Sequence, residues 1–239
     1  MQLSLALYGD GIKLPQESHR ALHGLIYHAL SCDPLYSAAL HAGSSGTERS
    51  YKGFTFGPLY GNISACGSGQ YLNGYAVVEI RSCDEEMITL LYRHFTACGE
   101  VRLGSSYAEV AEVNVTNRKP GLTQADVELI APAVAYITDD TRHTVFFSPD
   151  DEQFYKSLQS NAAGKARRFL RRTEELQIIP LFRELPRKEF VVFKGTYINA
   201  WYGRYRLKGS SELIDLLYDV GIGAKNSEGF GMFELIQNG

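Results

Sequence analysis

The sequence lacks long apolar runs: none approaches the roughly 18 residues that a membrane-spanning helix needs. The segment Met1–Tyr8 has neither the basic start nor the length of a secretory signal, so we expect a cytoplasmic protein with no membrane contact. Proline is scarce, with 8 residues, and charged residues make up 21% of the chain, which is typical of a folded globular protein. The 239 residues suffice for one large domain or two small ones.

Cysteine is also scarce, and its spacing does not match the usual zinc motifs. The chain has four cysteines, Cys32, Cys66, Cys83 and Cys98. They form no CxxC pair, so we expect them to be reduced and mostly buried. His19 and His23 lie four residues apart, but their HRALH segment lacks the glutamate of an HExxH motif and no third ligand is evident. We therefore expect no metal ion and no other cofactor.

A basic charge balance is lacking too, because the formal net charge is -3. Binding to nucleic acid must therefore be argued from the positions of the charges, which are uneven. Residues 1–140 contain 9 basic and 15 acidic residues, whereas the segment from Lys156 to Lys208 contains 13 basic and 4 acidic residues, a net charge of +9. This segment is the part of the chain that we expect to attract an anion.

The basic segment contains a cluster near the end of a predicted helix. Lys165, Arg168 and Arg172 fall on one helix face, and Arg167 and Arg171 fall on an adjacent one. Further along the chain, basic residues alternate with the aromatic residues at positions 201, 202 and 205. Basic side chains attract phosphates and aromatic rings stack on bases, so we expect Lys165, Arg168 and Arg172 to bind RNA. The alternative is a solvated basic face near the negative end of the helix dipole.

Hydrophobic periodicity predicts alternating strands and helices in the first half of the chain. Leu3, Leu5 and Leu7 recur with a period of two, which is typical of a half-buried strand, and the turn formers at 9–11 are expected to end it. The elements expected next are a helix over 15–31, a short helix over 33–41, strands at 54–56 and 75–80, a helix over 84–98 capped by Asp84, and strands at 101 and 107–115.

The second half repeats this order approximately. Pro120 and Gly121 interrupt the pattern, so we expect a linker between an N-terminal domain over residues 1–118 and a C-terminal domain over residues 123–239. The elements expected in the second domain are a strand at 130–137, a helix over 148–172, strands at 177–182, 190–193 and 197–207, a helix over 212–220, and a strand at 230–236. Two βαββαβ units predict an α+β fold of tandem ferredoxin-like, RRM-like domains.

A glycine-rich loop precedes the last predicted strand. Its glycines are Gly221, Gly223, Gly229 and Gly231. Glycine permits positive φ and lets backbone N–H groups approach a phosphate closely. The loop lacks the GxxxxGK[ST] pattern of a Walker A motif and follows a helix rather than a strand, so a nucleotide cofactor is not expected. The alternative interpretation is a helix cap followed by a β-bulge.

The segment GIGAKNSEGFGMFEL, with the preceding helix and the strand region from Gly195 to Leu207, resembles the C-terminal signature of the CRISPR-associated repeat-cleaving endoribonucleases. Matches elsewhere are the segments Leu14–Tyr27, Leu40–His41, Phe54–Leu59 and Phe147–Asp150, followed by Phe154 and Asn161. The resemblance to this family of the repeat-associated RNA-binding superfamily implies two ferredoxin-like domains and one cut within each repeat of the CRISPR transcript. It also implies that the glycine loop, with Lys225, Asn226 and Ser227, lies against the RNA.

Three residues are predicted to be catalytic. RNA carries its own nucleophile, the 2′-hydroxyl, so the protein need supply only proton transfer and charge stabilisation. The resemblance places His41 at the catalytic histidine and Tyr27 beside the scissile phosphate. Lys52 follows a loop that is longer than in other family members, and its ammonium group is suited to stabilise the developing negative charge. Arg49 is the alternative to Lys52, and His28 is the alternative to His41.

The resemblance therefore implies a metal-independent endoribonuclease that produces guide RNAs with a 2′,3′-cyclic phosphate. The expected partners are CRISPR repeat RNA and other subunits of a CRISPR effector complex, and the chain is expected to be a monomer or a homodimer. The main alternative is a non-catalytic subunit that binds repeat RNA, which would require neither His41 nor Tyr27. A domain for a small metabolite is a third interpretation, disfavoured by the +9 segment.

Overall fold

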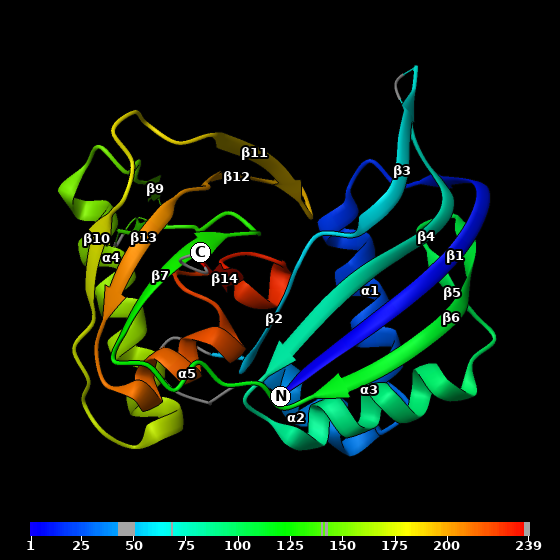
Figure 1. Cartoon of the computed structure of the whole chain (residues 1–239), viewed down its shortest axis with the longest axis horizontal. Coiled ribbons are helices and arrows are strands. Elements are labelled where there is room, and N and C mark those ends of the chain that lie inside the picture. The colour runs from blue at the N-terminus through cyan, green and yellow to red at the C-terminus, as the bar shows by residue number, and fades with distance from the viewer. Residues whose placement is uncertain (43–50, 68, 140, 142, 237–239) are drawn as a thin grey trace.

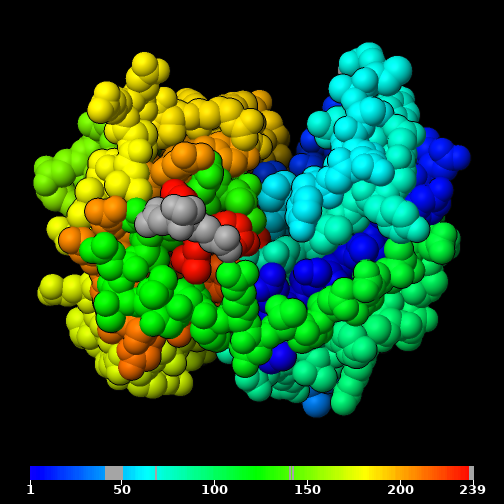
Figure 2. All heavy atoms as spheres, in the orientation of Figure 1, coloured from blue at the N-terminus to red at the C-terminus, as the bar shows by residue number. Residues whose placement is uncertain are grey.

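The computed structural model describes residues 1–42, 51–67, 69–139, 141 and 143–236, with the side chains of residues 41 and 42 excepted. The N-terminal and C-terminal halves form two lobes that lie side by side (Figure 1). On the face shown in Figure 2, the molecule is hollowed between the two lobes. Among the described residues, no helix has the length and apolar character needed to cross a membrane.

The N-terminal lobe is built on an antiparallel sheet with the strand order β2-β4-β1-β6-β5, and β3 also pairs with β4. The strands are β1 (Gln2–Leu14), β2 (Phe54–Phe56), β3 (Tyr60–Cys66), β4 (Gly69–Ser82), β5 (Glu100–Leu103) and β6 (Ser106–Thr116). The helices are α1 (Ser18–Leu30), α2 (Pro34–Ala42) and α3 (Glu85–Ala97). As the period of two predicted, Leu3, Leu5 and Leu7 are buried in one core with apolar residues of α1 and α3.

The C-terminal lobe contains a four-stranded sheet with the order β10-β13-β7-β14. Its strands are β7 (Gln124–Leu129), β10 (Gln177–Pro180), β13 (Arg204–Lys208) and β14 (Phe233–Leu235). Two antiparallel ribbons flank it, β8 (Tyr136–Thr138) with β9 (Thr144–Phe146) and β11 (Lys188–Phe193) with β12 (Thr196–Trp201). The helices are α4 (Glu152–Lys165), a π-helical turn (Ala166–Leu170), α5 (Ser211–Val220) and a 3-10 turn (Asn226–Glu228).

The two main sheets share one arrangement. In the N-terminal sheet, β4 and β6 flank the first strand β1, and both pairings are antiparallel. In the C-terminal sheet, β13 and β14 flank the first strand β7, again antiparallel. The α+β class predicted from the sequence is thereby confirmed.

The local caps follow the sequence closely. Asp84 accepts a hydrogen bond from the backbone N–H of Glu86 and caps α3, as predicted. Ser210, one of the two serines predicted as the cap of α5, accepts from the backbone N–H of Leu213. The start of α4 differs from the prediction, because the cap is Asp151 rather than a residue at 148–150.

Three predicted elements in the second half are wrong. Residues 130–135 do not form a strand but carry two isolated bridges, because this apolar run is buried in irregular backbone around Pro132. The helix predicted over 148–172 ends at Lys165 and continues as a π-helical turn that stops at Arg171, where φ is 60°. The strand predicted over 197–207 is divided at Gly203, where φ is 146°, into β12 and β13 of different sheets.

The structure of the first half differs from the sequence predictions in three ways. The strand β1 continues past the predicted turn to Leu14, with a register shift between Gly9 and Ile12. The strand β3 was not predicted, because its residues are nearly all exposed and lack hydrophobic alternation. The four cysteines are free, but the expectation that most are buried is wrong: Cys32 and Cys66 are exposed, and the other two are half-buried.

Buried charges join the two lobes. The Arg81 side chain of β4 is fully buried, pairs with Glu79 and Glu234, and donates a 2.7 Å hydrogen bond to the carbonyl oxygen of Phe233. Its guanidinium also lies 3.8 Å from the ring centre of Tyr218 in α5. A buried charge needs such partners, so these contacts hold β14 and α5 against the N-terminal sheet.

Candidate active site and nucleic-acid interface

The glycine-rich loop between α5 and β14 folds back on itself. The backbone N–H of Ile222 donates a 2.8 Å hydrogen bond to the carbonyl oxygen of Gly231. The carboxamide of Asn226 donates to the carbonyl oxygens of Ile222 and Phe230, at 3.0 and 2.9 Å. Gly231 has a φ of 75°, and a Cβ there would lie 1.9 Å from the Ile222 carbonyl oxygen. Close backbone approach therefore requires glycine at this position.

Lys165 supports this loop from inside the C-terminal lobe. Its side chain is 2% exposed, and its Nζ donates hydrogen bonds of 2.7 and 2.9 Å to the carbonyl oxygens of Gly221 and Gly223. Lys165 is therefore buried beneath the loop rather than on a solvated helix face, and its predicted role in binding RNA stays a prediction. A buried ammonium group requires oxygen partners, and the glycine loop supplies them.

The N-terminal lobe holds the other side of the loop. Nδ1 of His19 in α1 donates to the carbonyl oxygen of Glu228 at 3.0 Å, and its ring stacks on Phe230 with centroids 4.7 Å apart. Thr55 of β2 donates to the carbonyl oxygen of Phe230 at 3.1 Å. The loop is therefore fixed at the junction of the two lobes rather than extended into solvent.

The next residues along the same face of α1 also lie at this junction. The His23 ring stacks on Tyr27, with centroids 4.3 Å apart, and meets the edge of Phe193 in β11 at 5.3 Å. Burial, together with the negative charge of Glu228, raises the pKa of the Tyr27 phenol. The phenol therefore stays protonated at neutral pH and can donate a hydrogen bond. Within the described ranges, no group of His, Cys, Asp and Glu residues is arranged to hold a metal ion.

Lys52 lies just before β2, and its side chain contacts the end of the short helix α2. Its ammonium group donates a hydrogen bond to the carbonyl oxygen of Leu40, the residue before His41. Burial lowers the pKa of Lys52. His41 lies in the last turn of α2, but its side chain is outside the described part of the structure, as is all of Arg49. The ammonium group of Lys52 therefore lies beside the residue that precedes position 41.

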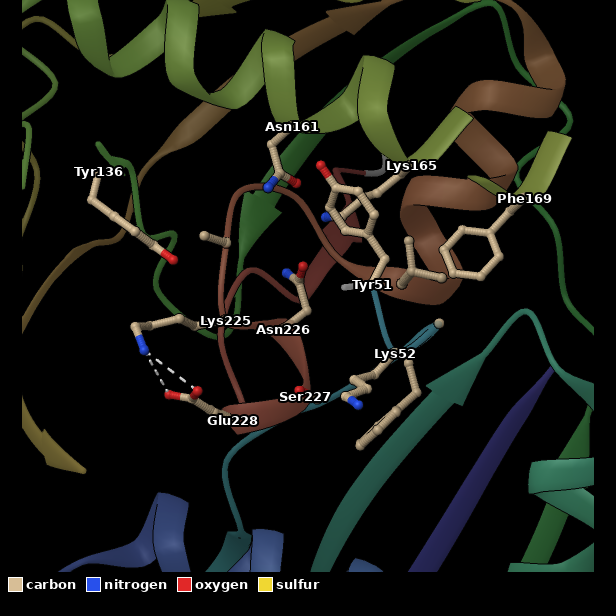
Figure 3. Close-up of a pocket in the computed structure, with 14 residues that line it drawn as sticks. Tyr51, Lys52, Tyr136, Asn161, Lys165, Phe169, Lys225, Asn226, Ser227 and Glu228 are labelled. Carbon is tan, nitrogen blue, oxygen red and sulfur yellow. Dashed lines mark hydrogen bonds and ion pairs between the residues drawn. The ribbon is translucent and has the colours of Figure 1, made fainter. Parts of the chain in front are cut away.

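A cavity of about 230 Å³ lies where these elements meet (Figure 3). The N-terminal half contributes Tyr51 and Lys52, α4 contributes Asn161 and Lys165, and the glycine loop contributes residues 225–228. Lys225 and Glu228 form an ion pair across the loop, with Nζ 3.2 Å from Oε2. The predicted residues Lys52, Lys225, Asn226 and Ser227 therefore line one cavity, although they come from both lobes.

A wider hollow of about 710 Å³ adjoins this cavity and shares Tyr51 and Tyr136 with it. Its basic residues are Lys156, Arg167, Arg168 and Arg171. We call this hollow the basic groove. The π-helical turn changes the helical spacing and brings Arg167 and Arg171, predicted on an adjacent face, beside Arg168.

Arg172 does not line the basic groove. It follows the left-handed residue Arg171, pairs with Glu174, and lies 3.5 Å from Glu212 of α5. The sequence prediction treated Arg172 as part of a continuous helix, and the end of that helix moves it to another surface.

A family model described as "CRISPR associated protein Cas6, C-terminal" matches residues 116–235, which is half of the chain and includes the glycine loop and the arginines of the basic groove. The chain belongs to the Cas6 family. The resemblance stated from the sequence is thereby confirmed.

Curated Cas6 relatives match along nearly the whole chain. "CRISPR-associated endoribonuclease Cas6" of Pyrococcus furiosus is 25% identical over 233 residues, covering 95% of this chain and 85% of the relative. "CRISPR-associated endoribonuclease Cas6 1" of Methanocaldococcus jannaschii is 23% identical over 238 residues, covering 97% and 91%.

Solved structures show the same fold. A structure described as "CRISPR associated protein Cas6" has a TM-score of 0.81 and 23% identity, with 99% of both chains covered. A Cas6-related protein from Pyrococcus furiosus has a TM-score of 0.84 and 18% identity, covering 100% of this chain and 99% of its own. The Cas6 fold therefore extends over both lobes, beyond the C-terminal part that the family model matches.

Sequence reasoning did not assign Tyr51, Tyr136 and Asn161 to the candidate site. A signal for Asn161 was present, because Phe154, Leu158 and Asn161 recur at helical spacing and share the buried face of α4. A polar residue on such a face needs a partner or a function.

Proposed function

We propose that this protein is a metal-independent endoribonuclease that cleaves precursor CRISPR RNA within its repeats to produce guide RNAs. Family membership supports the proposal, as do the two curated relatives named endoribonucleases. The observation that carries it is the convergence of Lys52 and the glycine loop on one cavity that opens beside a basic groove. Such a site offers proton transfer and charge stabilisation next to a surface for phosphates.

In the proposed reaction, the 2′-hydroxyl attacks the adjacent phosphate, giving a 2′,3′-cyclic phosphate and a 5′-hydroxyl. His41 transfers a proton as general acid or base, a role that suits histidine because the unperturbed pKa of this residue type is near 6.5. Tyr27, kept protonated by burial, donates a hydrogen bond to the hydroxyl or the phosphate. Lys52 stabilises the charge that develops on the phosphorane oxygens.

The RNA is held by the basic groove and the glycine loop. Arg168, with Arg167 and Arg171, attracts the phosphates of the backbone. The loop residues Lys225, Asn226 and Ser227 contact the RNA at the cavity, where Gly221, Gly223, Gly229 and Gly231 let the backbone approach closely. Lys165 acts indirectly, because its ammonium group is engaged by the loop carbonyls. Affinity should fall steeply with salt.

We also propose that each lobe is a ferredoxin-like domain, with boundaries at residues 1–118 and 123–239. The matching strand orders, in which the first strand lies between two later antiparallel strands, support this division. Further proposed partners are other subunits of a CRISPR effector complex, and the proposed state is a monomer or homodimer in the cytoplasm.

Cleavage of a labelled cognate repeat RNA in EDTA tests this function. The wild-type protein should cut once per repeat, and the cut should be lost with His41→Ala and with a substrate carrying 2′-deoxyribose at the scissile nucleotide. His143→Ala is the matched control, because His143 is exposed beside Asp139 on the β8–β9 ribbon.

Two other outcomes would change the proposed function or the proposed catalytic residue. Tight, salt-sensitive binding without a cut would identify a non-catalytic RNA-binding subunit. Cleavage that survives His41→Ala would move the proton transfer to His28 or His23.

A further inference from the structure

The cavity of Figure 3 contains a polar atom that the protein leaves without a partner. Asn161 of α4 is 3% exposed, and its carboxamide oxygen Oδ1 accepts no hydrogen bond from any described residue. Figure 3 shows the side chain extending from α4 into the cavity, toward the glycine loop. Buried polar atoms in folded proteins nearly always have partners, so an orphaned oxygen aimed into a cavity points to a ligand that donates a hydrogen bond.

The size and walls of the cavity suit a single flat ring system. Its volume of about 230 Å³ is below the roughly 300–1,000 Å³ of ordinary small-molecule pockets. Aromatic rings of Tyr51, Tyr136 and Phe169 line it. Gly164 lets Tyr51 lie against α4, because a Cβ there would be 2.2 Å from the Tyr51 hydroxyl oxygen. Aromatic walls of this kind stack on nucleobases.

Two of the cations around the cavity are engaged by the protein on the side of the glycine loop. Lys165 donates to two loop carbonyl oxygens, and Lys225 is paired with Glu228. A phosphate between Asn161 and the glycine loop would have to compete with these contacts, whereas Lys52 is the cation proposed for the scissile phosphate. In contrast, no described acidic residue forms an ion pair with Arg167, Arg168 or Arg171 in the adjoining basic groove. Phosphates therefore fit the groove, and a base fits the cavity.

Tyr51 and Tyr136 line both spaces, so they stand where one leads into the other. A single-stranded polynucleotide whose backbone follows the arginines of the groove can turn one base between these rings. We propose that the cavity binds one unpaired nucleobase of the RNA and that Asn161 Oδ1 selects a base with an exocyclic amino group. The proposal rests on the proposed RNA-binding function and makes Asn161 a specificity-determining residue.

The chemistry of the bases gives the direction of selection. Adenine N6 and cytosine N4 are amino groups that donate hydrogen bonds, and either can satisfy Oδ1. The corresponding position of uracil is a carbonyl oxygen, which would face Oδ1 with no proton between them. A base without the amino group leaves the Asn161 oxygen buried and unpaired, so its affinity falls.

The test measures binding of two fluorescently labelled RNA hexamers, oligoadenylate and an oligomer of purine riboside, which lacks only the 6-amino group. The proteins are wild type, Asn161→Leu, and Asn199→Leu as the matched control. Asn199 of β12 also has a buried Oδ1 without a partner, but it does not line the cavity. Thermal unfolding of each variant checks that it is folded.

We expect wild type and Asn199→Leu to prefer oligoadenylate by about 2- to 10-fold, as one neutral hydrogen bond implies. Asn161→Leu should bind both hexamers equally. Equal binding of the two hexamers by wild type would refute the proposed base pocket but not the proposed RNA binding. This result does not depend on whether Asn161→Leu folds. An unchanged preference in Asn161→Leu would also refute the base pocket. Failure of wild type to bind either hexamer at low salt would also overturn the base pocket, and failure to bind a labelled cognate repeat RNA as well would refute the proposed RNA-binding function itself.

Discussion

The ammonium group of Lys52 donates a hydrogen bond to the carbonyl oxygen of Leu40, and this contact holds the start of β2 against the last turn of α2. Leu40 immediately precedes His41, so the two proposed catalytic positions are linked through one backbone carbonyl. Burial lowers the pKa of Lys52, whereas burial raises the pKa of Tyr27. Relative to their ordinary pKa values, Lys52 therefore loses its proton at lower pH and Tyr27 at higher pH. The pH dependence of cleavage can distinguish the roles of the two groups.

Cleavage should decline at alkaline pH because Lys52 loses its proton. The charged ammonium is the form that stabilises the phosphorane, so the rate falls as pH rises through the lowered pKa of Lys52. Lys52→Arg should remove this alkaline decline, because arginine stays charged. Lys52→Met should slow cleavage about 10²- to 10³-fold below this pKa, and its deficit relative to wild type should shrink as pH rises above it. The measurement is the rate of single-turnover cleavage as a function of pH. An unchanged alkaline decline in Lys52→Arg would refute the proposed role of Lys52.

Lys165 should matter for the stability of the glycine loop. Lys165→Met keeps the length of the side chain but leaves the carbonyl oxygens of Gly221 and Gly223 without their donor. We expect the free energy of unfolding to fall by about 1–3 kcal/mol. Denaturant unfolding measures this, with Lys156→Met on the exposed side of α4 as the control. Equal stability of the two variants would show that the loop does not depend on Lys165.

The basic groove should account for part of the salt dependence of RNA binding. Arg168→Gln should weaken binding and reduce the slope of log affinity against log salt by about 0.7, as expected for one lost contact to a single strand. Arg172→Gln should leave the slope unchanged, because Arg172 is paired with Glu174 and Glu212 outside the groove. Titration of labelled RNA at several salt concentrations compares the two variants. Equal slopes for Arg168→Gln and Arg172→Gln would show that the RNA does not follow the basic groove.

The junction between α1 and β11 should weaken in acid. Contact with His19, whose Nε2 lies 3.9 Å away, and a hydrogen bond from Tyr202 lower the pKa of Glu189. A lowered carboxyl pKa contributes stability above the unfolded value of about 4.3, and this contribution is lost as pH falls through the folded pKa. Thermal unfolding between about pH 3 and pH 7 should show a smaller acid loss for Glu189→Gln than for wild type. Glu184→Gln is the control, because Glu184 is exposed outside the helices and strands, and it should lose as much stability in acid as wild type does.

Local patterns predicted much of the fold. The alternation of Leu3, Leu5 and Leu7 and the cap at Asp84 depend on neighbours within a few residues, and both are present. The strand β3 has no buried face, so hydrophobic alternation does not reveal it. The π-helical turn after Lys165 also has no sequence pattern that distinguishes it from a continued helix.

The site was less predictable because it is formed by contacts distant in sequence. The partners of Lys165 are 56 and 58 residues away, so its burial is not visible from the helix alone. His41, Tyr27 and Lys52 were assigned through the family resemblance and not through their spacing. Sequence analysis named Asn161 only as a match to the family and gave it no role, because the cavity that it lines is formed by residues of both lobes.

The chemical ends of the cleaved RNA test the central claim most directly. Mass spectrometry of the products from a cognate repeat RNA, cleaved in EDTA, should show a 2′,3′-cyclic phosphate on the upstream fragment and a 5′-hydroxyl on the downstream fragment. His41→Ala should yield neither product. A 3′-hydroxyl paired with a 5′-phosphate, or intact RNA bound tightly by the wild-type protein, would contradict cleavage by the 2′-hydroxyl.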